Sequence, residues 1–259
     1  MAQSENAAKK YLRLAIRIGA EMLAAGAEIE RVEDTIYRMC LAFGATKAQV
    51  FAMTTVIIVS IDGENYSGIT ELQRVHEVNR NLELLCALNN LSRDFCTHEI
   101  PINEWEEKLR AVEATPTMGT LPMMLWYAMV SAAFTIFFGG SYTDGAAGFV
   151  IGLLLAPFEA ILCRLKMNRF LRIVVCCFVA GMLAHRFVQQ GLGESTALIN
   201  IGNIMIYIPG VIFTTAVQET FADNMVSATT RLIETVVISV LIATGFVVAD
   251  IIFARGILP

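Results

Sequence analysis

Hydrophobic residues follow two different patterns along the chain. In the first 115 residues they alternate with many charged residues, whereas residues 116–259 contain long apolar stretches. A helix needs about 20 apolar residues to cross a bilayer. The second part therefore predicts an α-helical polytopic membrane protein with five transmembrane helices. The five stretches are roughly 119–138, 145–163, 170–188, 196–217 and 232–253.

The first 115 residues predict a cytosolic α+β domain that begins with a helical hairpin. Residues 8–25 and 28–43 repeat apolar side chains at helical spacing. Gly26 and Gly44 stand where these two helices are expected to end.

The middle of this domain predicts a β-hairpin. The apolar run 48–61 is typical of a strand, and Asp62-Gly-Glu-Asn65 separates it from a second such run, YSGITEL. An Asp-Gly pair between two such runs favours a tight turn. A long helix from about Val75 to Cys96 and a short helix opened by Pro101 are expected to follow, and Pro116 marks the predicted domain boundary.

The composition supports a division into a part that is exposed to water and a part that lies in lipid. The chain is 56% hydrophobic and 17% charged, with a mean hydropathy of +0.59, which is typical of membrane proteins. Residues 1–115 hold 12 Lys/Arg and 17 Asp/Glu, so they account for the net charge of −5. A basic surface for nucleic acid is absent, and no nucleic-acid partner is expected.

The placement of basic residues predicts the orientation in the membrane. The connection 164–172 holds Arg164, Lys166, Arg169 and Arg172, whereas 139–144 and 189–195 hold no Lys or Arg. Basic loops stay in the cytosol. We therefore expect a multi-pass protein of the cell (plasma or inner) membrane, with a cytoplasmic N-terminus and an external C-terminus.

Cysteine and histidine give no sign of a metal or redox site. The six cysteines lack metal-type spacing, and we interpret all of them as buried, reduced thiols. His76, His98 and His185 have no partner at ligand spacing. No nucleophile, base and orienting group can be assembled. The sequence predicts no catalytic residue, no cofactor and no metal, and hence a protein that is not an enzyme.

One acidic residue lies within the second apolar stretch. Gly148, Gly152, Ala156 and Glu159 recur at spacings that place them on one helix face. Such a small-residue groove can serve helix packing, with Glu159 reaching water at the membrane boundary. Alternatively, Glu159 serves transport, because an ionisable group in lipid is costly unless it is paired or wetted.

The fourth apolar stretch contains a polar stripe and a Pro-Gly pair. Pro209 removes a backbone N–H and leaves a carbonyl near Met205 without its usual partner. Transporters build binding sites from helices broken in this way, although a simple kink is the alternative. The stripe comprises Asn200, Asn203, Tyr207, Gly210, Thr214 and Gln218.

Charged residues cluster directly after this stretch. Thr215, Glu219 and Asp223 are four residues apart in turn and would share a face if the helix continued. Arg231 could compensate one of their carboxylates, and Glu234 follows it. These groups would suit proton coupling, and they would equally suit a salt bridge at the inner membrane surface.

Three segments resemble the threonine/serine exporter family and occur in that family's order. They are GAEMLAAGAEIERVEDTIYRMCLAFG (residues 19–44), RVHEVNRNLELLCALNNLSRDF (74–95) and YIPGVIFTTAVQETFADNMVSATTRLIET (207–235). The family usually has Arg-Asp and then Gly-Asp after its Pro-Gly pair. Here Gln218-Glu219 and Asp223-Asn224 stand in those places.

The resemblance implies export of small polar metabolites, such as threonine, serine or a dicarboxylate like succinate, driven by an ion gradient. The length resembles the larger subunit of the split, YjjP-like type. That type implies a YjjB-like small membrane subunit as partner and a hetero- or homo-oligomer in the lipid bilayer. The expected substrate-binding residues are Asn203, Tyr207, Pro209, Gly210, Thr214, Thr215, Gln218 and Glu159, and the expected coupling or gating residues are Glu219, Asp223, Arg231 and Glu234.

A different class of protein fits the same pattern. A homo-oligomeric membrane channel or ligand sensor would also combine several membrane helices with a cytosolic regulatory domain. Dependence of transport on a partner protein would favour the exporter over this alternative.

Overall fold

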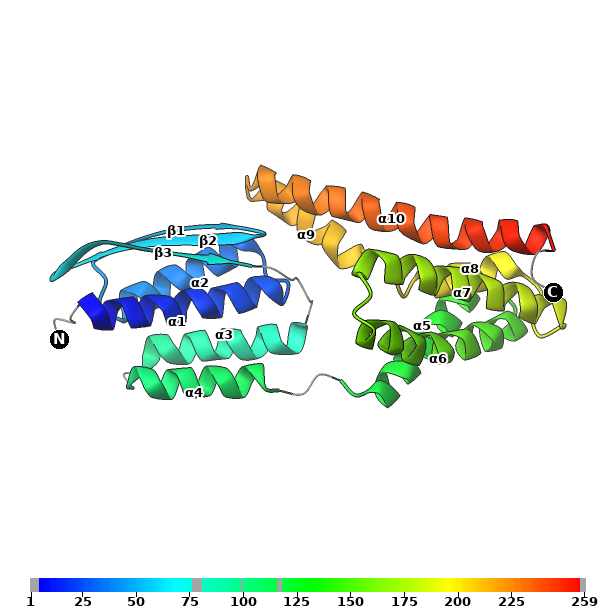
Figure 1. Cartoon of the computed structure of the whole chain (residues 1–259), viewed down its shortest axis with the longest axis horizontal. Coiled ribbons are helices and arrows are strands. Elements are labelled where there is room, and N and C mark those ends of the chain that lie inside the picture. The colour runs from blue at the N-terminus through cyan, green and yellow to red at the C-terminus, as the bar shows by residue number, and fades with distance from the viewer. Residues whose placement is uncertain (1–4, 76–80, 99, 116–117, 257–259) are drawn as a thin grey trace. The chain divides into compact units, whose positions relative to one another are not determined.

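The computed structural model describes residues 5–75, 81–98, 100–115 and 118–256 and is mostly helical (Figure 1). His76 and Pro116, and with them the predicted domain boundary, lie outside the described residues. The chain forms two compact units. The first unit comprises Met1–Thr115 and Thr215–Thr230, and the second comprises Pro116–Thr214 and Arg231–Pro259.

The first unit begins with the predicted helical hairpin. Helix α1 spans Glu5–Ala24 and α2 spans Ile29–Ala42. Gly26 and Gly44 have φ values of 100° and 97°, a left-handed conformation that glycine adopts without a Cβ clash. Both glycines therefore end their helices, as the sequence predicts.

A three-stranded antiparallel sheet follows, in the order β1-β2-β3. The strands are β1 (Lys47–Met53), β2 (Val56–Gly63) and β3 (Tyr66–Arg74). The predicted hairpin is confirmed for β2 and β3, in which Gly63 pairs with Tyr66. The run 48–61 is two strands, however, and the single-strand prediction was wrong. Its turn at Thr54-Thr55 consists of β-branched residues, which carry no turn signal.

The long predicted helix begins later than expected. Helix α3 spans Leu82–Thr97, and Val75 instead donates its N–H to the carbonyl of Thr55 (2.9 Å), which continues the sheet. The side chain of Asn81 caps α3 by accepting the N–H of Leu84 at 3.0 Å. Helix α4 spans Ile102–Glu113 directly after Pro101, as predicted.

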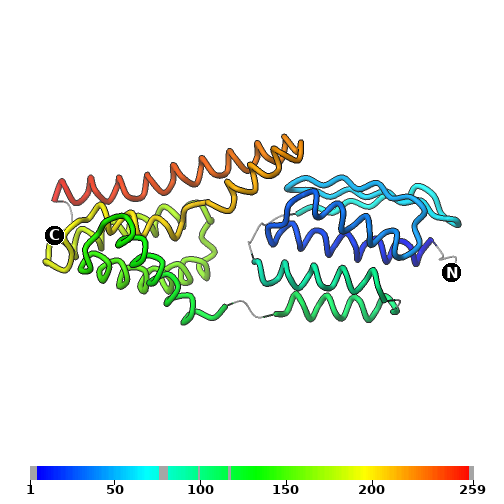
Figure 2. Tube along the Cα trace, turned by 180° about the vertical axis from the view of Figure 1, so that it is seen from behind, coloured from blue at the N-terminus to red at the C-terminus, as the bar shows by residue number. Residues whose placement is uncertain are grey.

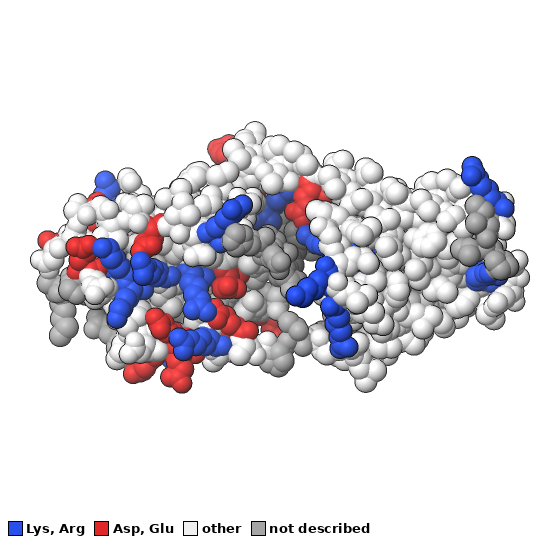
Figure 3. Space-filling view, viewed as in Figure 1, with Lys and Arg blue, Asp and Glu red and all other residues white. Residues whose placement is uncertain are grey.

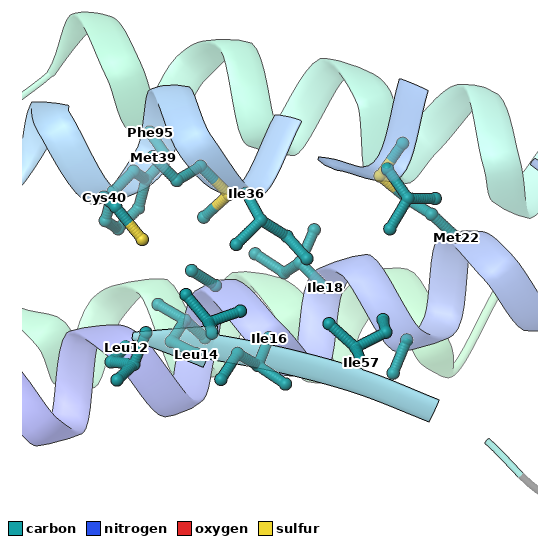
Figure 4. Close-up of a cluster of buried hydrophobic side chains, with 14 of the residues drawn as sticks. Leu12, Leu14, Ile16, Ile18, Met22, Ile36, Met39, Cys40, Ile57 and Phe95 are labelled. Carbon is teal, nitrogen blue, oxygen red and sulfur yellow. The ribbon is translucent and has the colours of Figure 1, made fainter. Parts of the chain in front are cut away.

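Buried side chains from all these elements form the core of the first unit. Figure 4 shows a part of it to which α1, α2, β2 and α3 contribute. One face of the sheet covers α1 and α2, and α3 and α4 lie on the opposite side of those helices (Figure 1). Ile57 of β2 and Ile18 and Ile36 of the hairpin are 0–1% exposed. The core of the first unit is thus built from both helices and strands.

Within the part of the chain that the structure describes, four helices are long and apolar enough to cross a membrane. They are α5 (Thr120–Phe137), α6 (Tyr142–Arg164), α7 (Arg169–Gln189) and α10 (Met225–Ala254). On the face shown in Figure 3, Lys, Arg, Asp and Glu residues are frequent over the first unit and sparse over the second. The chain is thus a multi-pass helical membrane protein.

The fourth predicted span is not a continuous helix. It consists of α8 (Thr196–Ile204) and α9 (Gly210–Phe221), separated by residues 205–209. Figure 2 shows the trace between the two helices leaving the helical path. Neither helix reaches the length of a span, so the count of five spans stays a prediction.

The cysteines do not all share the buried position that the sequence suggested. Cys40, Cys176 and Cys177 are buried, whereas Cys86, Cys96 and Cys163 are exposed at the surface of the chain. All six have free thiols. Burial raises the pKa of the Cys40 thiol to about 12, which keeps it protonated and unreactive at neutral pH.

Candidate functional site

Glu159 is the centre of a polar cluster among the membrane helices. Its Oε2 accepts the hydroxyl of Tyr127 from α5 at 2.9 Å and the hydroxyl of Tyr207 at 3.4 Å. Its Oε1 lies 3.3 Å from Nε of Arg172 at the start of α7. We call Tyr127, Glu159, Arg172 and Tyr207 the Glu159 cluster. Three membrane helices and the segment between α8 and α9 thus meet at one carboxylate.

The small residues of α6 explain how α5 comes close enough to join this cluster. A Cβ on Gly152 would lie 2.5 Å from the carbonyl oxygen of Tyr127, and one on Gly148 would lie 2.9 Å from Oγ1 of Thr135. The predicted packing role of this groove is confirmed. Close backbone approach at Gly152 holds Tyr127 beside α6, on which Glu159 lies two turns later.

A second polar group connects α5 with α8. Asn203 is fully buried, and its Oδ1 accepts the hydroxyl of Ser131 at 2.8 Å. Its Nδ2 donates to the carbonyl of Ile199 at 2.9 Å. A Cβ on Gly202 would collide with Thr135. Asn203 therefore satisfies its amide within the helix packing and holds the end of α8 against α5.

The Pro-Gly pair lies at the end of the segment that separates α8 from α9. Pro209 has no N–H, so the carbonyl of Met205 lacks the partner that a continuous helix would give it. The N–H of Gly210 donates to the carbonyl of Ile208 at 2.8 Å, and α9 begins there. Because Tyr207 lies inside this segment, the helix break positions its phenol at Glu159.

The break also divides the predicted polar stripe. Asn200 and Asn203 are buried on α8, whereas Thr214 and Gln218 are exposed on α9. The hydroxyl of Thr214 donates to the carbonyls of Gly210 and Val211 in its own helix (3.2 and 3.0 Å). The prediction of one stripe along one helix was therefore wrong, because residues 205–209 interrupt the helical periodicity.

The residues expected to couple or gate transport are spread over several places. Thr215 and Glu219 are buried, with 6% and 2% exposure. Asp223 does not share their face, because α9 ends at Phe221 and Asp223 is exposed with φ at 61°. The prediction of a three-residue face was wrong at this position.

The two remaining coupling candidates lie on α10. Arg231 is buried, with 4% exposure. Glu234 accepts Nη1 of Arg169 at 3.0 Å, which ties α10 to the start of α7. Glu234 is therefore part of an ion pair between helices.

Comparison with known proteins identifies the family. The family model described as "Putative threonine/serine exporter" matches residues 13–252. The chain belongs to the threonine/serine exporter family. The resemblance seen in the sequence is thus confirmed.

Similar proteins include a threonine/serine exporter of Corynebacterium glutamicum, which is 23% identical over 247 residues. The alignment covers 93% of this chain and 50% of that protein. The chain thus spans about half the length of this curated relative of the exporter family. No solved structure matches the chain.

The sequence reasoning missed two members of the Glu159 cluster in this exporter-family chain. Tyr127 and Arg172 were not assigned to the site, and Ser131 was overlooked as the partner of Asn203. A signal was present on α5, where Tyr127, Ser131 and Thr135 recur at intervals of four residues. Arg172 stands close to the end of an apolar stretch, where a long basic side chain usually reaches the interface.

Proposed function

We propose that the chain carries the substrate site of a secondary exporter of small hydroxy amino acids, threonine or serine, and that the Glu159 cluster is this site. One observation carries the proposal: a carboxylate and a guanidinium lie 3.3 Å apart among membrane helices, beside a broken helix. Ionisable groups at such positions are costly to keep and are characteristic of transport sites.

The charges of the cluster favour a zwitterionic substrate. An amino acid presents an ammonium group, which Glu159 can bind, and a carboxylate, which Arg172 can bind. The phenols of Tyr127 and Tyr207 can hydrogen-bond a substrate hydroxyl. A dicarboxylate such as succinate would bring two negative charges to a cluster with one cation and one anion. Threonine and serine are therefore the substrates that we propose.

The driving force and the partner complete the proposal. We infer that an ion gradient drives export. The Glu159 carboxylate, which lies in a membrane helix, could bind a coupling cation and the ammonium group of the substrate in turn. The distribution of Lys and Arg supports a cytoplasmic N-terminus and an external C-terminus. We also propose a YjjB-like small membrane subunit as the partner of this chain, which aligns with half of the curated exporter.

Efflux from proteoliposomes tests the function. We expect vesicles with this chain and a YjjB-like protein to release labelled threonine and serine when a pH gradient is imposed, and to release succinate much more slowly. Vesicles with either protein alone should release little. Absence of efflux of all three compounds from the two-protein vesicles would reject the proposed function, and faster succinate release would reject the proposed substrate class.

Replacing Pro209 with Ala is expected to reduce efflux severalfold. The alanine restores an N–H that can bond the carbonyl of Met205 and join α8 to α9, which would move Tyr207 away from Glu159. The matched control is Pro122→Ala, since Pro122 lies in the first turn of α5, where no helical hydrogen bond is lost. Equal efflux from both variants would show that the break has no role in transport.

A further inference from the structure

A second ionisable pair connects α7 and α10. Nε2 of His185 lies 2.7 Å from Oδ1 of Asp250, and the His185 ring stacks on Phe253 with centroids 4.2 Å apart and an interplanar angle of 12°. The His185 side chain is 17% exposed and that of Asp250 is 56% exposed. A carboxylate and an aromatic ring thus hold the histidine in place. The His185 side chain is mostly buried, whereas that of Asp250 is exposed at the protein surface.

The pair lies at one end of a close packing contact between α7 and α10. A Cβ on Gly181 would lie 2.8 Å from Cβ of Ala249, and one on Gly245 would lie 2.7 Å from the carbonyl oxygen of Val174. His185 follows Gly181 by one turn of α7, and Asp250 follows Ala249 directly on α10. With backbones this close, a change in the attraction between His185 and Asp250 acts directly on how α7 and α10 pack.

This pair is distinct from the Glu159 cluster. His185 lies 13 residues after Arg172 on the same helix, and a rise of 1.5 Å per residue separates the two by about 20 Å. That distance is roughly two thirds of the 30 Å hydrocarbon core of a bilayer. The membrane part therefore holds ionisable groups near both ends of α7.

Other charged groups lie near the His185–Asp250 pair. Arg186 follows His185 on α7, and Arg255 follows the end of α10. On the elements packed against α7, Asp144 of α6 accepts the N–H groups of Glu194 and Ser195 (2.6 and 2.9 Å). The carboxylate of Glu194 accepts the hydroxyl of Thr143 at 3.2 Å. Asp250 is thus the carboxylate that directly contacts His185.

We propose that His185 and Asp250 form a proton-binding site of the transport cycle, loaded from the side of the membrane at which α10 ends. In the tautomer that carries its proton on Nε2, His185 donates to the Asp250 carboxylate, so an incoming proton would bind Nδ1 and give an imidazolium paired with that carboxylate. Histidine is the side chain that ordinarily changes charge between about pH 5 and 8. The added charge strengthens the contact between α7 and α10. This inference rests on the proposed function, because it makes the coupling ion a proton.

Thermal unfolding of the purified chain tests the proton linkage without transport. The imidazolium attracts the Asp250 carboxylate more strongly than the neutral ring does, so removing that carboxylate costs more stability when His185 carries the added proton. We expect Asp250→Asn to lower Tm more at about pH 5.5 than at about pH 8. In a His185→Gln background, the Asp250→Asn effect should be the same at both pH values. Equal effects in the native background would overturn the proposal.

Efflux measured over a range of external pH tests the role in transport. We expect wild-type proteoliposomes to respond to external pH severalfold between about pH 5.5 and 8, and His185→Gln vesicles to lose most of this response. The control is His98→Gln, which removes an exposed histidine of the first unit. An unchanged response in His185→Gln would overturn the proposal. If no vesicle exports any substrate, the proposed function fails, and the unfolding result still decides whether the pair binds a proton.

Discussion

Export should fall at least about tenfold when Glu159 is replaced by Gln. The amide keeps the size of the side chain and can still accept the two tyrosine hydroxyls. It removes the negative charge beside Arg172, however, and with it the group proposed to bind the substrate ammonium. Glu159 and Arg172 form a largely buried ion pair, with 23% and 20% of their side chains exposed, and loss of one partner from a buried charge pair typically costs about 2 kcal/mol or more. Since 1.4 kcal/mol corresponds to a factor of 10, tenfold is a lower bound.

Two further variants separate a role in transport from a role in folding. Glu194→Gln removes a carboxylate of the second unit that lies outside the Glu159 cluster, and it should keep both export and Tm. The double variant Glu159→Gln with Arg172→Gln removes both charges. If the pair has only a structural role, this variant should regain the wild-type Tm and export. Recovery of export in the double variant would contradict our assignment, because the substrate site would still lack both charges.

A single methyl group on Gly152 should lower both the stability and the export of the protein. In Gly152→Ala the new Cβ would meet three backbone atoms, at 2.5 Å from O and 2.7 Å from C of Tyr127 and at 2.8 Å from Cα of Ala128. Backbone atoms cannot rotate away, so α5 must shift. Overpacking of this kind costs roughly 1–3 kcal/mol, which exceeds the gain of up to about 1 kcal/mol from the better helix propensity of alanine.

The matched control is Gly119→Ala, because the nearest atom to its new Cβ is Cδ of Pro122 at an ordinary contact distance of 3.8 Å. Gly119 is the N-cap of α5, where Ala is less favourable than Gly, so we expect Gly119→Ala to lower Tm only slightly in detergent and Gly152→Ala to lower it by several degrees. Export should fall as well, because movement of α5 takes Tyr127 away from Glu159. A wild-type Tm for Gly152→Ala would show that α5 and α6 are packed less closely than described.

Local chemistry explains which parts of the site could be predicted from the sequence. Pro209 disrupts a helix wherever it stands in the interior, so the break was predictable from one residue type. Glu159 was predictable because an acid in an apolar stretch requires an explanation. The contacts of Tyr127 and Arg172 were not predictable in the same way, since they depend on how closely α5 and α7 approach α6.

The same distinction applies to the parts of the fold that were mispredicted. The run 48–61 has uniform strand propensity, and its division at Thr54-Thr55 is set by the pairing of β1 with β2 rather than by a turn residue. Asp223 continues a four-residue spacing in the sequence, yet its left-handed backbone takes it out of α9. Periodicity predicts a face only as far as the helix extends.

The two arginines that begin α7 have a consequence for membrane insertion. Arg169 and Arg172 belong to the basic connection from which the orientation was inferred, but in the folded chain each lies beside a carboxylate, Glu234 and Glu159 respectively. Those carboxylates belong to α10 and α6, and α10 is synthesised after α7. During synthesis Arg169 therefore still carries an uncompensated charge. We propose that Arg169 helps to set the topology of the nascent chain and pairs with Glu234 once α10 has inserted.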